Sequence, residues 1–126
     1  MLTPIAYGLA TVLSLFIVLI GARFLLAPRA AAAGYGVPAT EGTGDPAYLT
    51  VKGLRDLTYG LVGLALIAFT SADADAVAWF MLVVALAPLG DTVIVLRHGG
   101  SRATAFGIHF ATAVVVLVSA ALLFAI

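Results

Sequence analysis

The chemistry of this chain is concentrated in a few ionisable side chains that stand inside otherwise apolar segments. Two of them are the acids Asp56 and Asp91, and two are the bases Arg23 and His109. Carboxylates in different surroundings can serve as an acid and a base, and a histidine can move a proton. Arginine can orient a carboxylate or stabilise a developing oxyanion. Such a set suits acid/base chemistry that needs no cofactor.

Helical spacing adds two candidates beside Asp56. Tyr59 lies three residues beyond it and therefore shares its face of a helix. Arg55 is its neighbour in sequence and points about 100° away from it. Tyr59 offers a second group for proton transfer. The candidate catalytic residues are Asp56, Asp91, His109, Arg55, Arg23 and Tyr59.

These charges are expected to pair across helices rather than within one. Arg55 is predicted to reach Asp91 while Asp56 meets Arg23, or the reverse. The alternative is that such pairs only hold the helices in register. A metal site is not favoured, because the arginines near the two acids and His109 would repel a cation, and no cofactor is expected.

The composition identifies the surroundings of these charges as a membrane. Of 126 residues, 63% are hydrophobic and only 10% are charged, and the mean hydropathy is +1.20. A soluble domain has about 45–50% apolar and about 25% charged residues. The formal net charge of zero argues against a nucleic-acid partner, which would need a basic surface. The chain has no cysteine, which excludes disulfides and thiolate chemistry.

Four apolar segments must position the charges. They cover approximately residues 4–27, 49–70, 75–96 and 104–126. Each is close to the roughly 20 residues that cross a bilayer core as a helix. Short links force neighbouring helices to run antiparallel. The sequence therefore predicts a single domain over 1–126, an all-α membrane protein with an up-down bundle of four transmembrane helices.

The longest link, 28–48, holds three prolines and four glycines. It is too long and too apolar for a simple turn. One interpretation is a flexible surface loop, and the other is a lid over one mouth of the bundle. Within the third segment, Pro88 removes a backbone donor one turn before Asp91, which is expected to loosen the helix there.

All of the basic residues fall on one side of this predicted topology. They are Arg23, Arg29, Lys52, Arg55, Arg97 and Arg102. The opposite side carries only Asp73 and Asp75. The positive-inside rule makes the basic side cytoplasmic, so both termini are expected on the other side of the cell membrane. Lys52 is interpreted as an anchor at the inner face, as are Arg29, Arg97 and Arg102 at helix ends.

Depth distinguishes the candidates from those anchors. With a rise of about 1.5 Å per residue, each predicted helix places one ionisable group at a similar depth inside the cytoplasmic leaflet. The four groups are Arg23, Asp56, Asp91 and His109. They are expected to face a common polar pocket in the bundle interior, since exposure to lipid would cost free energy. Glycines on the second helix, with Gly21 and Gly107 elsewhere, are expected to allow close helix contact.

Four blocks of the sequence, GARFLLAP, YLTVKGLRDLTYGL, APLGDTVIVLRHGG and AFGIH, resemble the small four-helix membrane proteins grouped as domain of unknown function 4267. The resemblance covers nearly the whole chain. It implies the four-helix architecture and emphasises the same charged layer, and it implies no reaction. The matching positions are Gly21, Arg23, Pro28, Lys52, Gly53, Arg55, Asp56, Gly60, Pro88, Gly90, Asp91 and His109.

Three functions are compatible with these features. The first is a cofactor-independent hydrolase or isomerase that acts on a lipophilic small molecule or lipid from the cytoplasmic leaflet, by epoxide opening, cyclisation or double-bond isomerisation. The second is a small proton-coupled transporter, which with four helices would require a homo-oligomer, because membrane-buried acids often couple proton movement. The third is a structural or accessory membrane subunit in which the charged layer only locks the bundle.

Overall fold

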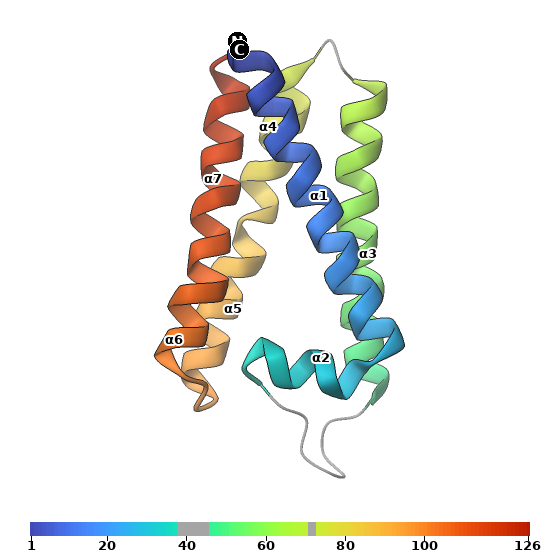
Figure 1. Ribbon diagram of the computed structural model, residues 1–126, viewed down its shortest axis with the longest axis vertical. Helices are drawn as coiled ribbons and strands as arrows, with labels where there is room; N and C mark the ends of the chain where they lie inside the picture. The colour runs from blue at the N-terminus through green and yellow to red at the C-terminus, as the bar shows by residue number, and fades with distance from the viewer. Residues whose placement is uncertain (38–45, 71–72) are drawn as a thin grey trace.

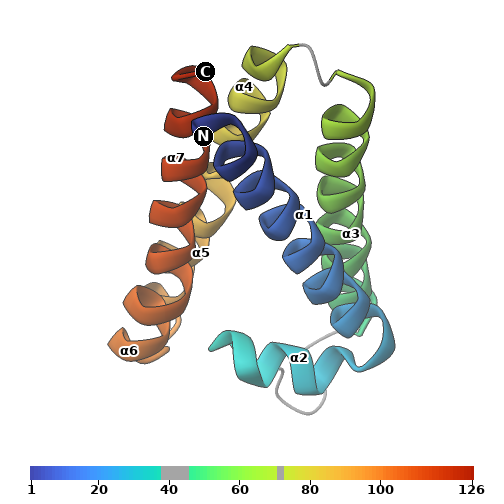
Figure 2. The ribbon, with the colours of Figure 1, turned by 45° about the horizontal axis from the view of Figure 1, so that its top comes forward.

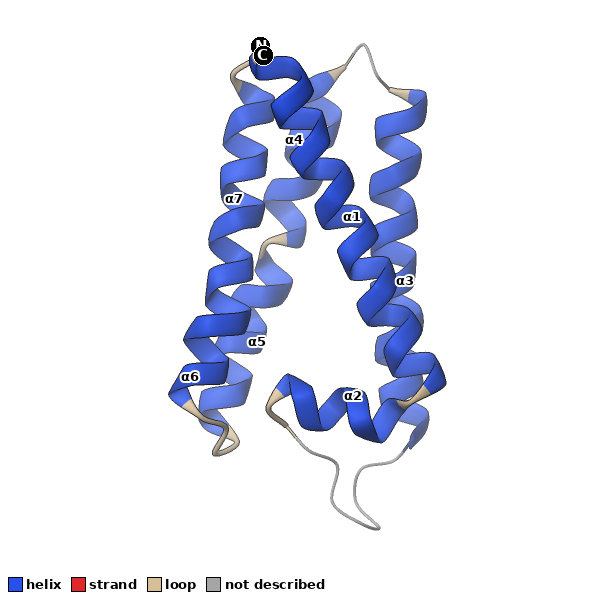
Figure 3. Cartoon of the chain, in the orientation of Figure 1, coloured by secondary structure: helices blue, strands red, loops and turns tan. Residues whose placement is uncertain are grey.

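The computed structural model describes residues 1–37, 46–70 and 73–126. Every regular element in those ranges is a helix (Figure 3). In chain order they are α1 (Leu2–Leu26), α2 (Pro28–Tyr35), α3 (Pro46–Phe69), α4 (Ala74–Val84), α5 (Leu86–Arg97), α6 (Arg102–Thr104), the π-helix η1 (Ala105–Phe110) and α7 (Ala111–Phe124). The part of the predicted link at 38–45 lies outside the described residues.

Three helical stretches are long and apolar enough to cross a membrane. They are Leu2–Leu26, Ala74–Arg97 and Arg102–Phe124. Large apolar side chains cover much of their outer surface, among them Leu19, Trp79 and Val118. A soluble protein rarely exposes so much contiguous apolar surface. The chain is therefore a helical protein of membrane type, as its composition predicted.

The third predicted helix is divided, and the structure shows why. α4 ends at Val84 and α5 begins at Leu86. Pro88 has no amide hydrogen to donate to the carbonyl of Val84, so the helical hydrogen bonding is interrupted at this point. The break is visible as a loop between α4 and α5 in Figure 3. It lies at the same level as the start of the polar region described below.

Glycines hold α1 and α3 together in the most extensive helix contact of the described chain. A Cβ atom added at Gly53 would lie 2.9 Å from the carbonyl oxygen of Gly21, and one at Gly60 would lie 2.6 Å from that of Ser14. Only glycine permits so close an approach of two helix backbones. Gly107 differs from the expectation, because open space surrounds it.

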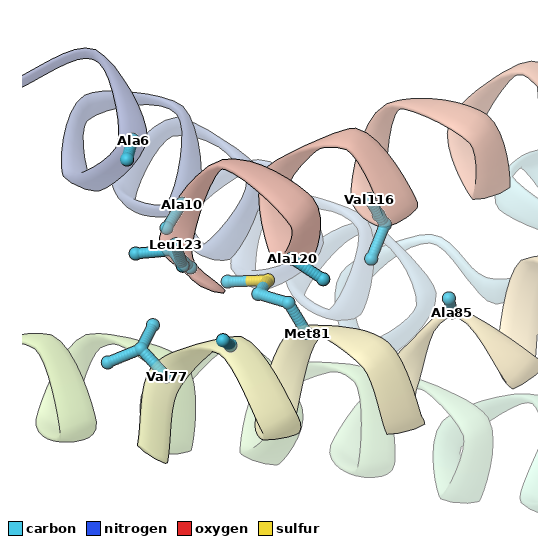
Figure 4. Close-up of a cluster of buried hydrophobic side chains, with 9 residues drawn as sticks. Ala6, Ala10, Val77, Met81, Ala85, Val116, Ala120 and Leu123 are labelled. Atoms are coloured by element: carbon cyan, nitrogen blue, oxygen red, sulfur yellow. The ribbon is translucent and has the colours of Figure 1, made fainter. Parts of the chain in front are cut away.

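The second helix pair consists of α4 with α7, continued by α5 with η1. In Figures 1 and 2, α1 leans from α7 near the chain termini towards α3 at the opposite end. The two pairs therefore meet near the termini and diverge away from them. Small and branched side chains fill the region where they meet (Figure 4). This packed core contains Ala6, Ala10, Val77, Ala78, Met81, Ala85, Val116, Ala120 and Leu123.

The short helix α2 lies across the end where the pairs diverge (Figure 1). Ala27 leaves the helical conformation at φ −142° and ψ 65°, and Pro28 then starts α2 in a new direction. Gly36 ends α2 in the left-handed conformation with φ 94°. A Cβ atom at Gly36 would lie 2.6 Å from the Cγ2 methyl of Thr104. α2 therefore begins beside α1 and ends against α6.

Candidate functional site

A cavity of about 360 Å³ occupies the space between the diverging helix pairs. Its walls come from α1, α2, α3, α4, α5, η1 and α7, and most of them are apolar. Five of the six predicted site residues line it, namely Arg23, Asp56, Tyr59, Asp91 and His109. The sequence expectation that four helices each direct one ionisable group towards a common space is thus met in geometry. Whether these groups carry out catalysis stays a prediction.

The lining groups differ in their exposure. Asp56 and His109 are buried, with 7% and 3% of their surface exposed, and Asp91 is half-buried. Arg23 and Tyr59 are more exposed and lie towards the edge of the cavity. Arg55, the sixth predicted residue, is exposed and is not among the lining residues. The cavity therefore has a buried acid and a buried histidine, with an arginine and a tyrosine nearer its opening.

Tyr35 of α2 makes the central contact of the site. Its hydroxyl donates a hydrogen bond to Oδ2 of Asp91, which connects the short helix to α5. Burial raises the pKa of Tyr35, and the negative charge of Asp91 and the hydrogen bond to it raise that pKa further. The phenol therefore keeps its proton at neutral pH and remains a donor. In this pair Tyr35 is the hydrogen-bond donor and Asp91 is the acceptor.

His109 is oriented by the backbone of the same tyrosine. Its Nε2 lies 2.7 Å from the carbonyl oxygen of Tyr35. Because a carbonyl oxygen can only accept, Nε2 must carry the hydrogen, and in the neutral ring Nδ1 is then the atom that can take a proton. The two rings also contact each other, with centroids 4.2 Å apart. His109 belongs to η1, and π-helical segments of this kind are frequent at functional sites.

Asp56 pairs with Lys52 and not with an arginine. The Nζ atom of Lys52 lies 2.7 Å from Oδ2 of Asp56, one helical turn away on α3. This is the only ion pair among the described residues, so the expected pairs of Arg23 or Arg55 with the two acids do not form. One turn of helix brings Lys52 and Asp56 together without any crossing between helices, which explains the difference.

Lys52 also contacts two aromatic rings. Its ammonium lies 4.3 Å from the centroid of the Tyr35 ring and 4.9 Å from that of Phe24. Phe24 itself meets Tyr35 edge to face, with centroids 5.5 Å apart. A cation over aromatic faces is attracted by their electron density. Lys52 thus contacts Asp56 on one side and α2 on the other, which are contacts that its interpretation as an anchor did not include.

Sequence reasoning missed Tyr35, which it left inside the link 28–48. A signal was present, because Pro28 followed eight residues later by Gly36 has the pattern of a short helix with its first and last positions marked. In this part of the chain α2 contributes to the wall of the cavity, and the interpretation of the link as a lid stays a prediction. Residues 38–45 of the link lie outside the described chain.

The described residues contain no cluster of three or more metal-ligating side chains of the His, Cys, Asp and Glu types. Asp56 and Asp91 each use one carboxylate oxygen on a neighbour within the protein, the first on Lys52 and the second on Tyr35.

Comparison with known proteins gives one match. No curated protein and no solved structure matches the chain. A family model described as Domain of unknown function (DUF4267) matches residues 14–123. This range leaves out the first turns of α1 and the last residues of the chain. It includes α2, the rest of both helix pairs and the candidate residues Arg23, Asp56, Tyr59, Asp91 and His109. The protein therefore belongs to the family of domain of unknown function 4267.

Proposed function

We propose that this protein is a membrane-embedded acid/base enzyme that converts a lipophilic small molecule without a cofactor. One observation carries the proposal. At the wall of an apolar cavity of about 360 Å³, the Tyr35 hydroxyl donates a hydrogen bond to Asp91, and the backbone carbonyl of Tyr35 accepts one from His109 Nε2. A proton donor and two proton acceptors at an apolar cavity are the components of general acid–base catalysis.

The proposed setting is a bundle of four transmembrane helices with the basic end in the cytoplasm. α3 supplies the fourth crossing, because its 24 residues extend about 36 Å and it packs along α1. Both termini lie at the end opposite α2 (Figure 1), and Arg29 and Arg102 lie in or beside the short helices at the α2 end. The positive-inside rule places that end in the cytoplasm and the termini outside the cell membrane.

The proposed chemistry divides the roles between the two walls of the cavity. On the α5 side, the Asp91 carboxylate removes a proton from carbon or activates a water molecule. When the substrate binds, the Tyr35 hydroxyl turns from Asp91 to donate its hydrogen bond to the oxygen on which charge develops, such as an enolate or an opening epoxide, and this frees the Asp91 carboxylate to act as the base. His109 Nδ1 is a second acceptor that can pass the proton on. On the α3 side, Asp56 is fixed by Lys52 and contributes negative charge, with Tyr59 nearer the opening.

Isomerisation illustrates the proton balance. Asp91 takes a proton from the carbon next to a carbonyl group, and the electron pair moves into the enolate, whose oxygen Tyr35 stabilises. The protonated Asp91 then returns the proton to the far end of the double-bond system. Nothing is consumed, and both residues end in their starting state. Epoxide opening uses the same base to activate water, while Tyr35 donates its proton to the ring oxygen. The protonated Asp91 then returns that proton to Tyr35 through the hydrogen bond that joins them, so both residues are restored and one water is added to the substrate.

A transporter remains the second candidate, and one feature of the fold speaks against it. The region where the helix pairs meet is packed without exposed surface at Ala6, Val77 and Leu123. A passage to the termini side would have to cross this packed core. The cavity reaches from the α2 end to the level of Leu13 and Met81. A site that is open to one leaflet suits conversion of a membrane-dissolved substrate better than transport across the membrane.

The proposal is tested with purified protein in phosphatidylcholine nanodiscs and two lipophilic probes. One probe is 1,2-epoxydecane, whose diol is detected by mass spectrometry, and the other is a β,γ-unsaturated decenone, whose conjugated product absorbs in the ultraviolet. Asp91→Asn is expected to lower the rate of conversion by about 10²–10⁴-fold, the usual contribution of a general base. Asp73→Asn is the matched control, because Asp73 only caps α4 by accepting from the Ala76 amide at 3.3 Å.

Two results would contradict the proposal. The first is the absence of conversion by the unmodified protein for either probe. The second is an Asp91→Asn variant that converts a probe as fast as the Asp73→Asn control. If Asp91→Asn and variants of Tyr35 fail to fold while the Asp73→Asn control folds, the structural role for the charged layer is favoured.

A further inference from the structure

Arg23 differs from the other charged groups of the cavity because no side chain of the described protein neutralises it. Its guanidinium makes no ion pair and no side-chain hydrogen bond with any described residue, although it lines the cavity. It is located in the last turn of α1, at the end of the membrane helix, and is exposed at the cavity edge. An arginine is always charged and presents five donors in a planar fork that fits a carboxylate.

The remaining charges of the site are already partnered. Asp56 has Lys52 at 2.7 Å, and Asp91 accepts the hydroxyl of Tyr35. Among the described residues that line the cavity, the charge without a charged or hydrogen-bonded partner is therefore that of Arg23, which lies on α1, away from the α5 wall that carries Asp91. An incoming acid would meet a free guanidinium there. An incoming amine would meet the positive charge of Arg23 at the same place.

We infer that the ligand of this cavity is an acidic amphiphile, a single lipophilic body with a carboxylate or comparable anion that binds Arg23. This assignment rests on the proposed function for the location of the reacting group, which would lie deeper, opposite Asp91. The acid stays at the cytoplasmic edge of the membrane, where an anion is least costly, and the body enters the apolar cavity.

The dimensions of the cavity agree with a single-chain or small polycyclic body. On α1 its lining extends from Leu13 to Arg23, an axial length of about 15 Å. Its volume of about 360 Å³ is at the lower end of the range for small-molecule sites, roughly 300–1,000 Å³. The two chains of a bilayer phospholipid would not fit. The cavity therefore selects a free amphiphile rather than a structural lipid, even when both carry an anion.

Binding of three matched probes tests this assignment. Decanoate, decanol and decylamine share one chain and differ in head-group charge. Each is measured by equilibrium dialysis on nanodiscs of phosphatidylcholine with and without the protein, at a pH at which decanoate is ionised. The variants are Arg23→Gln, Arg23→Lys and Arg29→Gln. Arg29 is the matched control because it is also an exposed arginine at this end of the molecule but does not line the cavity.

Decanoate is expected to bind most tightly to the unmodified protein. Arg23→Gln should weaken decanoate binding about tenfold, the usual order for one charge-assisted pair, and should leave decanol unchanged. Arg23→Lys should restore part of the affinity, since it keeps the charge and loses the planar fork. Arg29→Gln should bind all three probes as the unmodified protein does.

Several outcomes would overturn the assignment. One is an equal weakening of decanoate binding in Arg23→Gln and Arg29→Gln, which would indicate only a general effect of surface charge. Another is tighter binding of decylamine than of decanoate, with that preference lost in Asp91→Asn. Undiminished binding of decanoate to Arg23→Gln would show that Arg23 only reaches for lipid head groups. Absence of saturable binding for all three probes would overturn it as well. If acid binding depends on Arg23 but no probe is converted, the enzyme proposal fails while the acid site stands.

Discussion

The two ends of the molecule are built on opposite principles. Near the termini, α1, α4 and α7 converge, and the buried residues are small or apolar, as in the packed core of Ala6, Val77 and Leu123. At the α2 end α1 diverges from α5 and η1, which continue α4 and α7, and the buried groups include Asp56 and His109. The inclination of α1 produces both conditions, because a straight helix that approaches α7 at one end must leave it at the other.

This difference separates, along the bundle axis, the residues that stabilise the packed bundle from the residues of the proposed chemistry. In a membrane the unfolded helices remain in an apolar solvent, so close packing contributes more to the folded state than removal of surface from water. The larger packed core is at the terminal end, and the α2 end has the glycine contact of α1 with α3 and a smaller cluster of Phe24, Ala31 and Ala32. The α2 end can therefore carry a cavity and ionisable groups at little cost to the bundle. Changes at the two ends should have separable effects.

The largest expected effect is at the α2 end. Tyr35→Phe removes the hydroxyl that Asp91 accepts and leaves the ring against His109 and Phe24. Conversion of the epoxide and decenone probes should fall about 100-fold, equivalent to about 2.7 kcal/mol of transition-state stabilisation. The rate is measured in nanodiscs, with thermal unfolding measured in parallel. An unchanged rate would show that the Tyr35–Asp91 pair has no part in the chemistry.

The second effect is at the terminal end and concerns stability. Leu123→Ala leaves a void in the packed core, where Leu123 is 0% exposed, and should lower the free energy of unfolding by about 2 kcal/mol. Leu117→Ala is the control, because Leu117 faces outwards with 36% of its surface exposed, and should cost less than about 0.5 kcal/mol. Unfolding in detergent by heat or denaturant measures both variants.

Binding of decanoate should be the same in both leucine variants and in the unmodified protein. If Leu123→Ala weakens decanoate binding as much as it lowers stability, the two ends are coupled and the comparison is wrong.

The smallest effect concerns the docking of α2. Gly36→Ala places a side chain at φ 94° against the Thr104 methyl, which should favour an undocked α2 by about 1 kcal/mol. Gly34→Ala is the control, because Gly34 lies inside α2 with open space around it and alanine is the better helix former by about 1 kcal/mol. Hydrogen exchange of the α2 amides should be faster in the first variant and slower in the second. A change in the same direction in both would mean that Gly36 does not fix the position of α2.

The long apolar helices could be predicted from the sequence because their signal is local. A run of about 20 apolar residues indicates a membrane helix whatever its neighbours do, and the three stretches found in the structure follow these runs. The glycines of α3 indicated a close contact for a similar reason, since they repeat on one face. The family was also recognisable from four short blocks, and the match over 14–123 confirms it.

The contacts of the site could not be predicted because they depend on tertiary geometry. The sequence showed that Lys52 and Asp56 are one turn apart. A lysine at a helix end can equally well extend to the lipid head groups, unless aromatic rings lie beside it. Those rings come from Phe24 and Tyr35, and Tyr35 reaches its place only after α2 has turned across the bundle. The depth of His109 was predictable, whereas its hydrogen bond to a backbone carbonyl of another helix was not.

The position of Tyr35 also has a consequence for how the protein matures. Its partners Asp91 and His109 follow it by 56 and 74 residues in the chain. Membrane helices insert first and associate afterwards, and contacts so distant in sequence form late. A nascent chain that has delivered only α1 and α2 to the bilayer holds Tyr35 without either partner. The Tyr35–Asp91 pair can form only after α5 has entered the membrane, and the contact with His109 only after the last helix has done so, so the proposed acid–base site is complete only in the full-length bundle.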